Sequence, residues 1–325
     1  MRYAKMLLAC ALGLSFAAAS SPTAHAQFSP NQPVTLVVGF AAGGAADIIG
    51  RLIAEQLGTH LDGAKIVVEN RGGASGNTAA RLVASSPPNG HTILVTTTAI
   101  AVNETLSKDK GFSSSDLRTI SIAAATPDVL VVNPDNPAKT LQELVANGKR
   151  KSVTFGTAGV STSPYVAAAY FFKELAKIEA VHVPFPGGAP ALNALLGGHI
   201  DAVAITLPTP VPHIKDGRLR GLAVASKERM AVVPGVPTYE ESGYPGFLHD
   251  TWVGLFVNSK TSDEIAGKLN NAVNAVLNDK RFQQRLNDIG FRTQPRPLGE
   301  ADSYYRSEIQ DWNKMITRIG LTTGK

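Results

Sequence analysis

Residues 34–47 read VTLVVGFAAGGAAD, and this stretch contains the features that decide the fold. Its first half is a short, nearly all-apolar run rich in β-branched residues, which is typical of a buried parallel strand. The pair Gly43-Gly44 allows a tight turn and a close approach of the backbone to a ligand. From residue 48 to residue 61 the apolar side chains follow a helical spacing. The sequence therefore predicts a strand, a glycine turn and a helix in direct succession.

Strand and helix patterns alternate over the rest of the chain. Strands are predicted at residues 65–69, 92–96, 129–132, 153–156, 180–183, 202–205, 219–225 and 252–257. Helices are predicted at residues 77–85, 141–149, 164–176, 189–196, 211–215, 262–277 and 302–319. Such alternation is typical of βαβ units and of parallel sheets flanked by helices.

The number of strands favours two α/β lobes, each a mainly parallel sheet with helices on its faces. We expect residues 27–131 and 225–325 to form a discontinuous first lobe and residues 132–224 to form the second. Hinge strands are expected near 128–133 and 221–226, where they would permit closure around a ligand. One continuous doubly wound domain is the alternative.

Residues 1–26 have the pattern of a secretory signal peptide, which places the mature protein in the periplasm. Arg2 and Lys5 precede an apolar run at 6–19, and Ala24-His25-Ala26 gives a small-x-small site with cleavage after Ala26. A membrane anchor is the alternative, but the run is shorter than the roughly 20 residues that span a bilayer. The only cysteine, Cys10, lies in this segment, so the mature chain is expected to contain no disulfide and no thiolate ligand.

The charge balance argues against nucleic acid as a partner. The whole chain carries a net charge of +5, and removal of two basic residues with the signal peptide lowers it. The longest basic run, at 149–151, lies between a helix pattern and a strand pattern and is expected to be a solvated loop. A mildly positive balance does suit an anionic ligand.

The glycine turn after the first strand is a candidate anion site. The following helix begins with unpaired N–H groups and a partial positive charge, which bind anions through the backbone alone. The candidates here are Phe40, Ala41, Ala42, Gly43, Gly44 and Asp47, with Asp47 expected to cap the helix. An ordinary tight turn is the alternative. Similar turns occur at 71–77, 156–163 and 186–190, where Ser163 is expected to cap the next helix and Pro164 to begin it.

Hydroxyl side chains are frequent in the loops that follow the strands. They suit hydrogen bonding to a carboxylate, although local turns and caps are their common alternative role. These candidates are Thr97, Thr98, Thr157, Ser161, Thr162, Ser163 and Thr206. Clefts in parallel sheets lie at the carboxyl ends of strands, where these loops are expected.

Enzyme signatures are absent from the sequence. It contains no G-x-S-x-G, no G-x-x-x-x-G-K-[ST] and no G-x-G-x-x-G, and its seven histidines lack close metal-binding spacing. We therefore predict a protein that is not an enzyme and that has no catalytic residue, no cofactor and no metal. A Ser-His-Asp set assembled in space remains open at this level.

At the level of motifs the sequence resembles the solute-binding proteins of tripartite tricarboxylate transporters, also called Bug-type receptors. The resemblance covers nearly all of the chain after residue 26. It rests on PVTLVVGFAAGGAAD (33–47), VVENRGGASGN (67–77), PNGHT (88–92), VLVVNP (129–134), HVPFPGGAPAL (182–192), LPTPVPHIK (207–215), LAVAS (222–226), PGVPT (234–238) and WVGLF (252–256). Their order and spacing together are specific.

The resemblance implies a two-lobed periplasmic binding protein fold of type II, the Venus-flytrap arrangement, without catalysis. It implies capture of a small organic acid for delivery to membrane permease subunits, and we expect the receptor to be a monomer. The loop at 40–44 would offer main-chain N–H groups to a carboxylate, and the loop at 157–163 would hold the ligand from the other lobe. Phe185, within the 182–192 motif, joins the candidate ligand-binding residues.

The chain also departs from the family pattern. Ile205 and Thr206 stand where the family often has Asp-Asn, which predicts a ligand without an ammonium group. Tyr165 replaces a common histidine, and Ala41 and Ala42 occupy positions where proline is frequent. Two other functions remain open: a periplasmic sensor for a signalling partner, and a secreted hydrolase with an unrecognised site.

Overall fold

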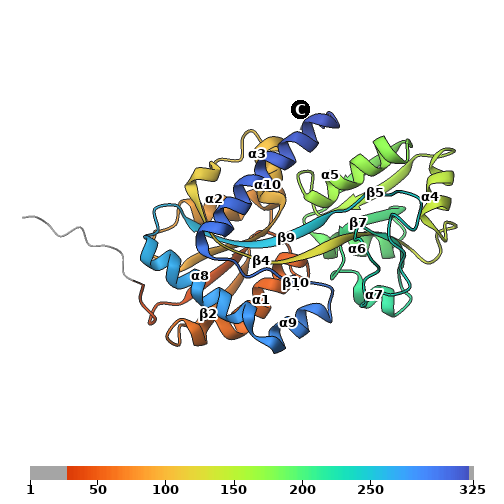
Figure 1. Ribbon diagram of the computed structural model, residues 1–325. Coiled ribbons are helices and arrows are strands. Elements are labelled where there is room, and N and C mark those ends of the chain that lie inside the picture. Colours follow the sequence, from red (N-terminus) through yellow and green to blue (C-terminus); the bar gives the residue numbers. More distant parts are fainter. Residues whose placement is uncertain (1–27, 322–325) are drawn as a thin grey trace, which may run out of the picture.

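A ten-stranded mixed sheet runs through both halves of the molecule in the computed structural model, which describes residues 28–321 (Figure 1). The predicted signal peptide lies outside the described residues. The strands are β1 (Val34–Val38), β2 (Ile66–Asn70), β3 (Thr92–Thr97), β4 (Leu117–Val132), β5 (Val153–Thr157), β6 (Ala180–Pro184), β7 (Ala202–Thr206), β8 (Arg220–Val224), β9 (Asp250–Asn258) and β10 (Arg292–Thr293). Their order is β2-β1-β3-β9-β4-β7-β5-β6, with β8 and β10 paired to β4.

The helices lie on the faces of this sheet. They are α1 (Ala45–Leu57), α2 (Asn77–Ala84), α3 (Ala99–Leu106), α4 (Leu141–Gly148), α5 (Ser163–Tyr170), α6 (Gly188–Leu196), α7 (Val211–Lys215), α8 (Asp263–Asn278), α9 (Lys280–Asn287) and α10 (Leu298–Arg318). Short turns occur at η1 (Gly58–His60), η2 (Ala74–Gly76), η3 (Ser114–Asp116) and η4 (Phe171–Leu175). Thr140, Ser262 and Asp279 cap α4, α8 and α9 with their side chains, as the sequence preferences of helix starts require.

Strand β4 joins the two lobes. Its first part, up to Pro127, pairs antiparallel with β9, whereas residues from Asp128 onward pair antiparallel with β7 and β8. Parallel pairs flank it on both sides: β1 with β2 and β3, and β5 with β6 and β7. The predicted fold class, two α/β lobes of the periplasmic binding protein type, is confirmed. The sheet as a whole is mixed because β4 and β9 run against their neighbours.

The chain returns to the first lobe later than the sequence indicates. Tyr239 and Phe247 pack against Phe171 in the buried core of the second half, so residues 225–249 lie on the second lobe. The N–H group of His249 donates to the carbonyl oxygen of Ala225, and β9 begins at the next residue. The crossing expected near residues 221–226 places this segment in the first lobe, and its prolines and glycines give no apolar periodicity that would indicate the second.

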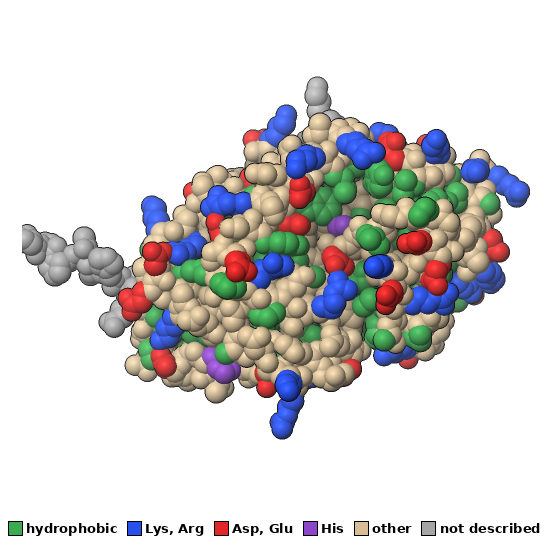
Figure 2. All heavy atoms as spheres, viewed as in Figure 1, with side chains coloured by type: hydrophobic (Ala, Val, Ile, Leu, Met, Phe, Trp, Pro, Cys, Tyr) green, Lys and Arg blue, Asp and Glu red, His purple; other side chains and the backbone are tan. Residues whose placement is uncertain are grey.

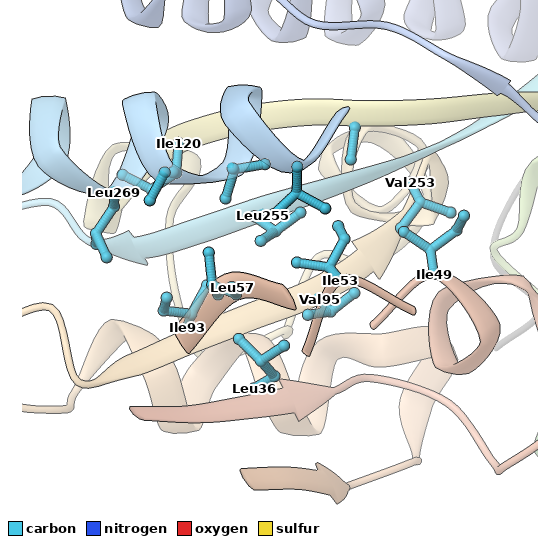
Figure 3. Packing of buried hydrophobic residues seen from close by; sticks show 14 of the residues in the cluster. Leu36, Ile49, Ile53, Leu57, Ile93, Val95, Ile120, Val253, Leu255 and Leu269 are labelled. Carbon is cyan, nitrogen blue, oxygen red and sulfur yellow. The ribbon is translucent and has the colours of Figure 1, made fainter. Parts of the chain in front are cut away.

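Helix α1 is held firmly by the core of the first lobe. Figure 3 shows Ile49, Ile53 and Leu57 on the inner face of α1, among side chains from β1, β3, β9 and α8. All three are fully buried, and each such burial contributes about 1.5–3 kcal/mol. The helix begins at Ala45, three residues before the apolar spacing starts. Its amino end is therefore fixed at the edge of the sheet where β1 ends.

Candidate functional site

A cleft lies between the two lobes. The first lobe contributes the start of α1, the end of β3 and the start of β9, and the second contributes the loop before α5, the start of α6 and the end of β7. The lining residues are Phe40, Gly44, Ala45, Ala46, Thr97, Ala158, Thr162, Pro164, Gly188, Ala204, Ile205, Thr206, Thr209 and Thr251. The cleft is thus apolar with interspersed hydroxyl groups.

The amino end of α1 offers free backbone donors to this cleft. Gly44 is the N-cap residue, and the first intrahelical bond runs from the N–H of Ile48 to the Gly44 carbonyl oxygen at 3.0 Å. Within residues 28–321, nothing accepts a hydrogen bond from the N–H groups of Ala45 and Ala46, and both residues line the cleft. These donors carry the partial positive charge of a helix start, so the site is suited to an anion.

Asp47 supports this turn from behind and does not line the cleft. It is not the N-cap residue that we expected, because Gly44 takes that position. Its carboxylate accepts the N–H of Gly43 at 2.9 Å, pairs with Arg51 at 2.9 Å and accepts from the Asn70 amide at 2.8 Å. Burial alone would raise the pKa of Asp47, but the hydrogen bonds from Arg51, Gly43 and Asn70 outweigh it and lower the pKa. The paired Arg51 also offsets the negative charge that would otherwise oppose an anion at α1.

The second lobe presents two further helix starts to the same cleft. Thr162 is the N-cap residue of α5, and Gly188 is the first residue of α6. Ser163 does not cap α5, contrary to expectation. It is already helical, and its hydroxyl lies 3.0 Å from the hydroxyl of Thr251 on β9. Three helix starts therefore contribute residues to the lining, one from the first lobe and two from the second.

The structure brings five of the predicted ligand-binding residues to the cleft and leaves nine away from its lining. The lining ones are Phe40, Gly44, Thr97, Thr162 and Thr206. The others have structural contacts: Thr98 accepts the N–H of Trp252, Thr157 donates to the Gly159 carbonyl oxygen, and half-buried Phe185 packs on the second-lobe core. The remaining six are Ala41, Ala42, Gly43, Asp47, Ser161 and Ser163.

Several lining residues were missed by the sequence analysis. Ala45 and Ala46 contribute through backbone groups, and their position in the first turn of α1 was the available signal. Gly188 belongs to a glycine turn that the sequence does mark. Thr209 and Thr251 reach the cleft only through the fold, because β7 and β9 lie on either side of β4.

No ionisable side chain lines the cleft among the residues that the structure describes. On the face viewed in Figure 2, acidic and basic side chains are interspersed and do not gather into one basic patch. Across residues 28–321, no three His, Cys, Asp or Glu side chains are grouped to hold a metal ion. None of the helices in this range combines the length and apolarity needed to cross a bilayer. Charge recognition in the cleft therefore falls to backbone N–H groups and hydroxyls.

A buried contact between an imidazole and a carboxylate lies behind the cleft, at the hinge. The Thr251 hydroxyl, on the cleft wall, donates to Asp128 at 2.9 Å, and Nε2 of His249 lies 3.0 Å from the same carboxylate. Burial alone would lower the pKa of His249, but attraction to Asp128 and to the charges of Asp250 and Glu308 outweighs burial and raises the pKa. These contacts tie together the two points at which the chain passes between the lobes.

A half-buried histidine supports the loop of the second lobe. His182 on β6 lies 2.7 Å from the hydroxyl of Thr157 and stacks on the ring of Tyr165 at 4.2 Å. Because the Thr157 hydroxyl donates its hydrogen to Gly159, it accepts from Nε2 of His182. Burial lowers the pKa of His182 to about 4, so this histidine is neutral at pH 7.

The comparisons with known proteins agree with this geometry. The family described as "Tripartite tricarboxylate transporter family receptor" matches residues 49–321. The periplasmic binding protein BugD is 28% identical, with 91% of this chain and 100% of that chain covered and a TM-score of 0.85. A protein of R. palustris solved with adipate is 28% identical, covering 91% of this chain and 99% of that chain with a TM-score of 0.87. MatC from Rhodopseudomonas palustris, solved with bound malate, is 31% identical, covering 89% of this chain and 100% of that chain with a TM-score of 0.81.

These matches extend over both lobes and the hinge, and one of the similar proteins bears the name of a Bug receptor. The chain therefore belongs to the receptor family of the tripartite tricarboxylate transporters, which are Bug-type solute-binding proteins of the periplasmic binding protein fold.

Proposed function

We propose that this receptor captures a small carboxylate between its lobes and delivers it to the membrane permease of a tripartite transporter. The observation that carries the proposal is the pair of N–H groups at Ala45 and Ala46, which donate to no group within residues 28–321 and belong to residues that line a cleft without ionisable side chains. A carboxylate at this position gains the helix dipole without a buried counter-charge. The similar proteins solved with adipate and with malate support the same ligand class.

The ligand-binding residues that we propose are those that line the cleft from both lobes. Gly44, Ala45 and Ala46 of the first lobe would bind the carboxylate. Thr162 and Thr206 of the second lobe would form hydrogen bonds to the same ligand. Binding would draw the lobes together, because contacts to both are made only in the closed state. No step of this cycle requires a catalytic residue, so we propose a receptor and not an enzyme.

The ligand is proposed to lack an ammonium group. Ile205 lines the cleft with an apolar side chain, and no carboxylate among the described residues reaches the lining. An ammonium would therefore be desolvated without a charged partner, which is costly. Aspartate and glutamate should accordingly bind far more weakly than dicarboxylates of the same length.

Export to the periplasm, cleavage after Ala26 and a monomeric state complete the proposal. The pattern of Arg2, Lys5 and the apolar run at 6–19 supports export. Intact mass of the protein recovered from the periplasm tests the cleavage site, and light scattering tests the oligomeric state.

A ligand panel tests the central claim. Malate, adipate and aspartate, with the neutral diamide of adipic acid as matched control, are titrated against residues 27–325 by calorimetry and thermal shift. A bound ligand raises the melting temperature by mass action. We expect a shift with at least one dicarboxylate and none with the diamide or aspartate. Equal binding of acid and diamide would contradict recognition by the helix start.

A further inference from the structure

Ser75 of the first lobe contacts the ligand loop of the second lobe directly. Its hydroxyl oxygen accepts the N–H of Ser161 at 3.2 Å. The hydroxyl of Ser161 in turn lies 3.4 Å from that of Ser107, which follows α3 in the first lobe. Ser161 immediately precedes Thr162, whose side chain lines the cleft. A group outside the cleft lining thus holds the loop that forms one of its walls.

The backbone on both sides is adapted to this contact. A Cβ atom at Gly159 would lie 2.5 Å from the Ser75 hydroxyl oxygen, so only glycine leaves room for the serine. Ser75 itself has φ 54° and ψ 38°, a left-handed conformation that a residue with a side chain rarely adopts. Such a conformation at a non-glycine residue persists where its surroundings hold it, and it often marks a functional position.

A buried amide fixes Ser75 from below. The side-chain N–H of Asn103 donates to the Ser75 carbonyl oxygen at 3.0 Å, and its oxygen accepts from Ser107 at 2.9 Å. Asn103 is only 1% exposed, so its amide is committed to this network. We call Ser75, Asn103, Ser107 and Ser161 the interlobe clasp. Three of its members belong to the first lobe and one to the second.

We propose that Ser75 is a positioning residue for ligand capture, which stabilises the closed receptor without touching the ligand. The hydrogen bond from the Ser161 N–H to Ser75 can form only when the lobes meet. It therefore lowers the free energy of the closed state and leaves that of the open state unchanged. Any ligand that needs the closed state is then retained longer, because the closed population is larger. This inference rests on the proposed binding function and adds a residue that its cleft does not contain.

Gly187 and Ala41 make a close approach between the lobes that is of a different kind. A Cβ atom at Gly187 would lie 2.8 Å from Cβ of Ala41, so the second contact is backbone against a methyl group. The contact between Gly187 and Ala41 limits how far the lobes can close. Ala41 makes no backbone hydrogen bond to the described residues of the second lobe. The lobes are also joined by the hydroxyl pair of Ser163 and Thr251 at 3.0 Å and by the Lys173 ammonium, which donates to the Ile319 carbonyl oxygen at 2.8 Å. Ser75 is thus one of several directional contacts between the lobes, and the one that holds the backbone of Ser161.

The first test compares Ser75→Ala and Ser75→Gly with wild type, using malate and adipate as probes. Loss of one hydrogen bond should raise the dissociation rate and Kd about threefold to tenfold, with the association rate unchanged. Ser75→Gly should keep the wild-type melting temperature, since glycine is unstrained at positive φ. Ser303→Ala is the matched control, because the Ser303 hydroxyl bonds only within its own helix.

The second test does not depend on a ligand. Residues 28–321 contain no cysteine, so spin labels can be placed on Leu82→Cys and Val181→Cys, at exposed positions of the first and second lobe. Distances between the labels report closure. We expect both Ser75 variants to shift the distribution toward longer distances, with or without the probes.

Identical distance distributions and dissociation rates in wild type and in both Ser75 variants would overturn the clasp. A Ser75→Gly variant that unfolds at lower temperature would also overturn it, because the serine would then be structural. If wild type bound neither probe, the proposed function would fail for those ligands, while the label distances would still decide on Ser75.

Discussion

The half-buried His182 and the buried imidazole of His249 have surroundings that favour opposite charge states. His182 lies under the second-lobe loop beside Tyr165 and Thr157, and burial lowers its pKa to about 4. His249 lies at the hinge beside Asp128, where the surrounding acids outweigh burial and raise its pKa. The comparison teaches that the imidazole under the ligand loop is kept neutral, whereas the acids around the hinge favour protonation of the imidazole there. A neutral wall leaves the ligand as the one anion in the cleft.

The largest effect should come from breaking the hinge pair. Asp128→Asn keeps the acceptor for the Thr251 hydroxyl but leaves His249 without its counter-charge, which costs about 3–5 kcal/mol in a buried pair. Urea unfolding at pH 6 measures the loss. Adding His249→Gln to Asp128→Asn should recover part of the stability. If the double variant were as unstable as the sum of both single ones, the pair would not be coupled.

The next effect should come from placing charge in the neutral cleft. Ile205→Asp puts a carboxylate beside the α6 start, where the Ile205 side chain already meets Gly188. Repulsion should weaken binding of a dicarboxylate by about tenfold or more, which is roughly 1.4 kcal/mol or above. Ile205→Asn, of the same shape and uncharged, is the control and should stay within a few fold. Calorimetry with the ligand identified by the panel decides between charge and shape.

A smaller effect should follow from occupying the free donors of α1. In Gly44→Ser the new hydroxyl can accept from Ala46 as an N-cap, which removes a donor that the ligand needs. The expected result is a Kd raised about threefold to tenfold with unchanged or slightly increased stability. Gly44→Ala lacks the acceptor, and its Cβ would be no closer than 3.7 Å to a neighbour. Equal loss of affinity in both variants would indicate steric crowding instead.

The smallest effect should be on the pH dependence of the free energy of unfolding, which has an acid limb and an alkaline limb of opposite sign. The raised pKa of His249 gives stability that is fully present below its ordinary pKa of 6.5 and is lost as pH rises through the folded value. The lowered pKa of His182 gives the reverse, with stability lost as pH falls from 6.5 toward about 4. Urea unfolding from pH 4 to 9 measures both. His182→Gln should flatten only the acid limb and His249→Gln only the alkaline one.

The sequence predicted the strand and the glycine turn at residues 34–44, but it did not predict where helix α1 begins. Residues 34–38 form the expected strand, and Gly43 adopts φ 82°, as the glycine argument requires. Helix α1 begins before its apolar pattern because Ala45 and Ala46 have small side chains that give no periodic signal. The free N–H donors belong to these same two residues. Because the donors are backbone groups, the side-chain pattern of the sequence gives little indication of them.

A hinge strand was expected near residues 128–133, but the side-chain contacts at the hinge and in the clasp could not be predicted in the same way. Only residues 129–132 of β4 were expected as strand, because the preceding residues include a proline and several alanines. Asp128 meets His249, and Ser75 meets Ser161, only after strands far apart in sequence have paired. Local patterns indicate that loops collect at one edge of a sheet, but the partner of each side chain is set by topology.

The pairing of β4 with β9 should keep the receptor assembled after a protease cuts the chain between β8 and β9. Lys227 and Arg229 are exposed on the segment between β8 and β9, where trypsin could cut. The amino-terminal fragment would retain β4, and the carboxyl-terminal fragment would retain β9. Strand β9 pairs with β4 over residues 250–258. The two pieces would remain interwoven until denaturant separates them, so a nicked receptor would keep its native mass in gel filtration.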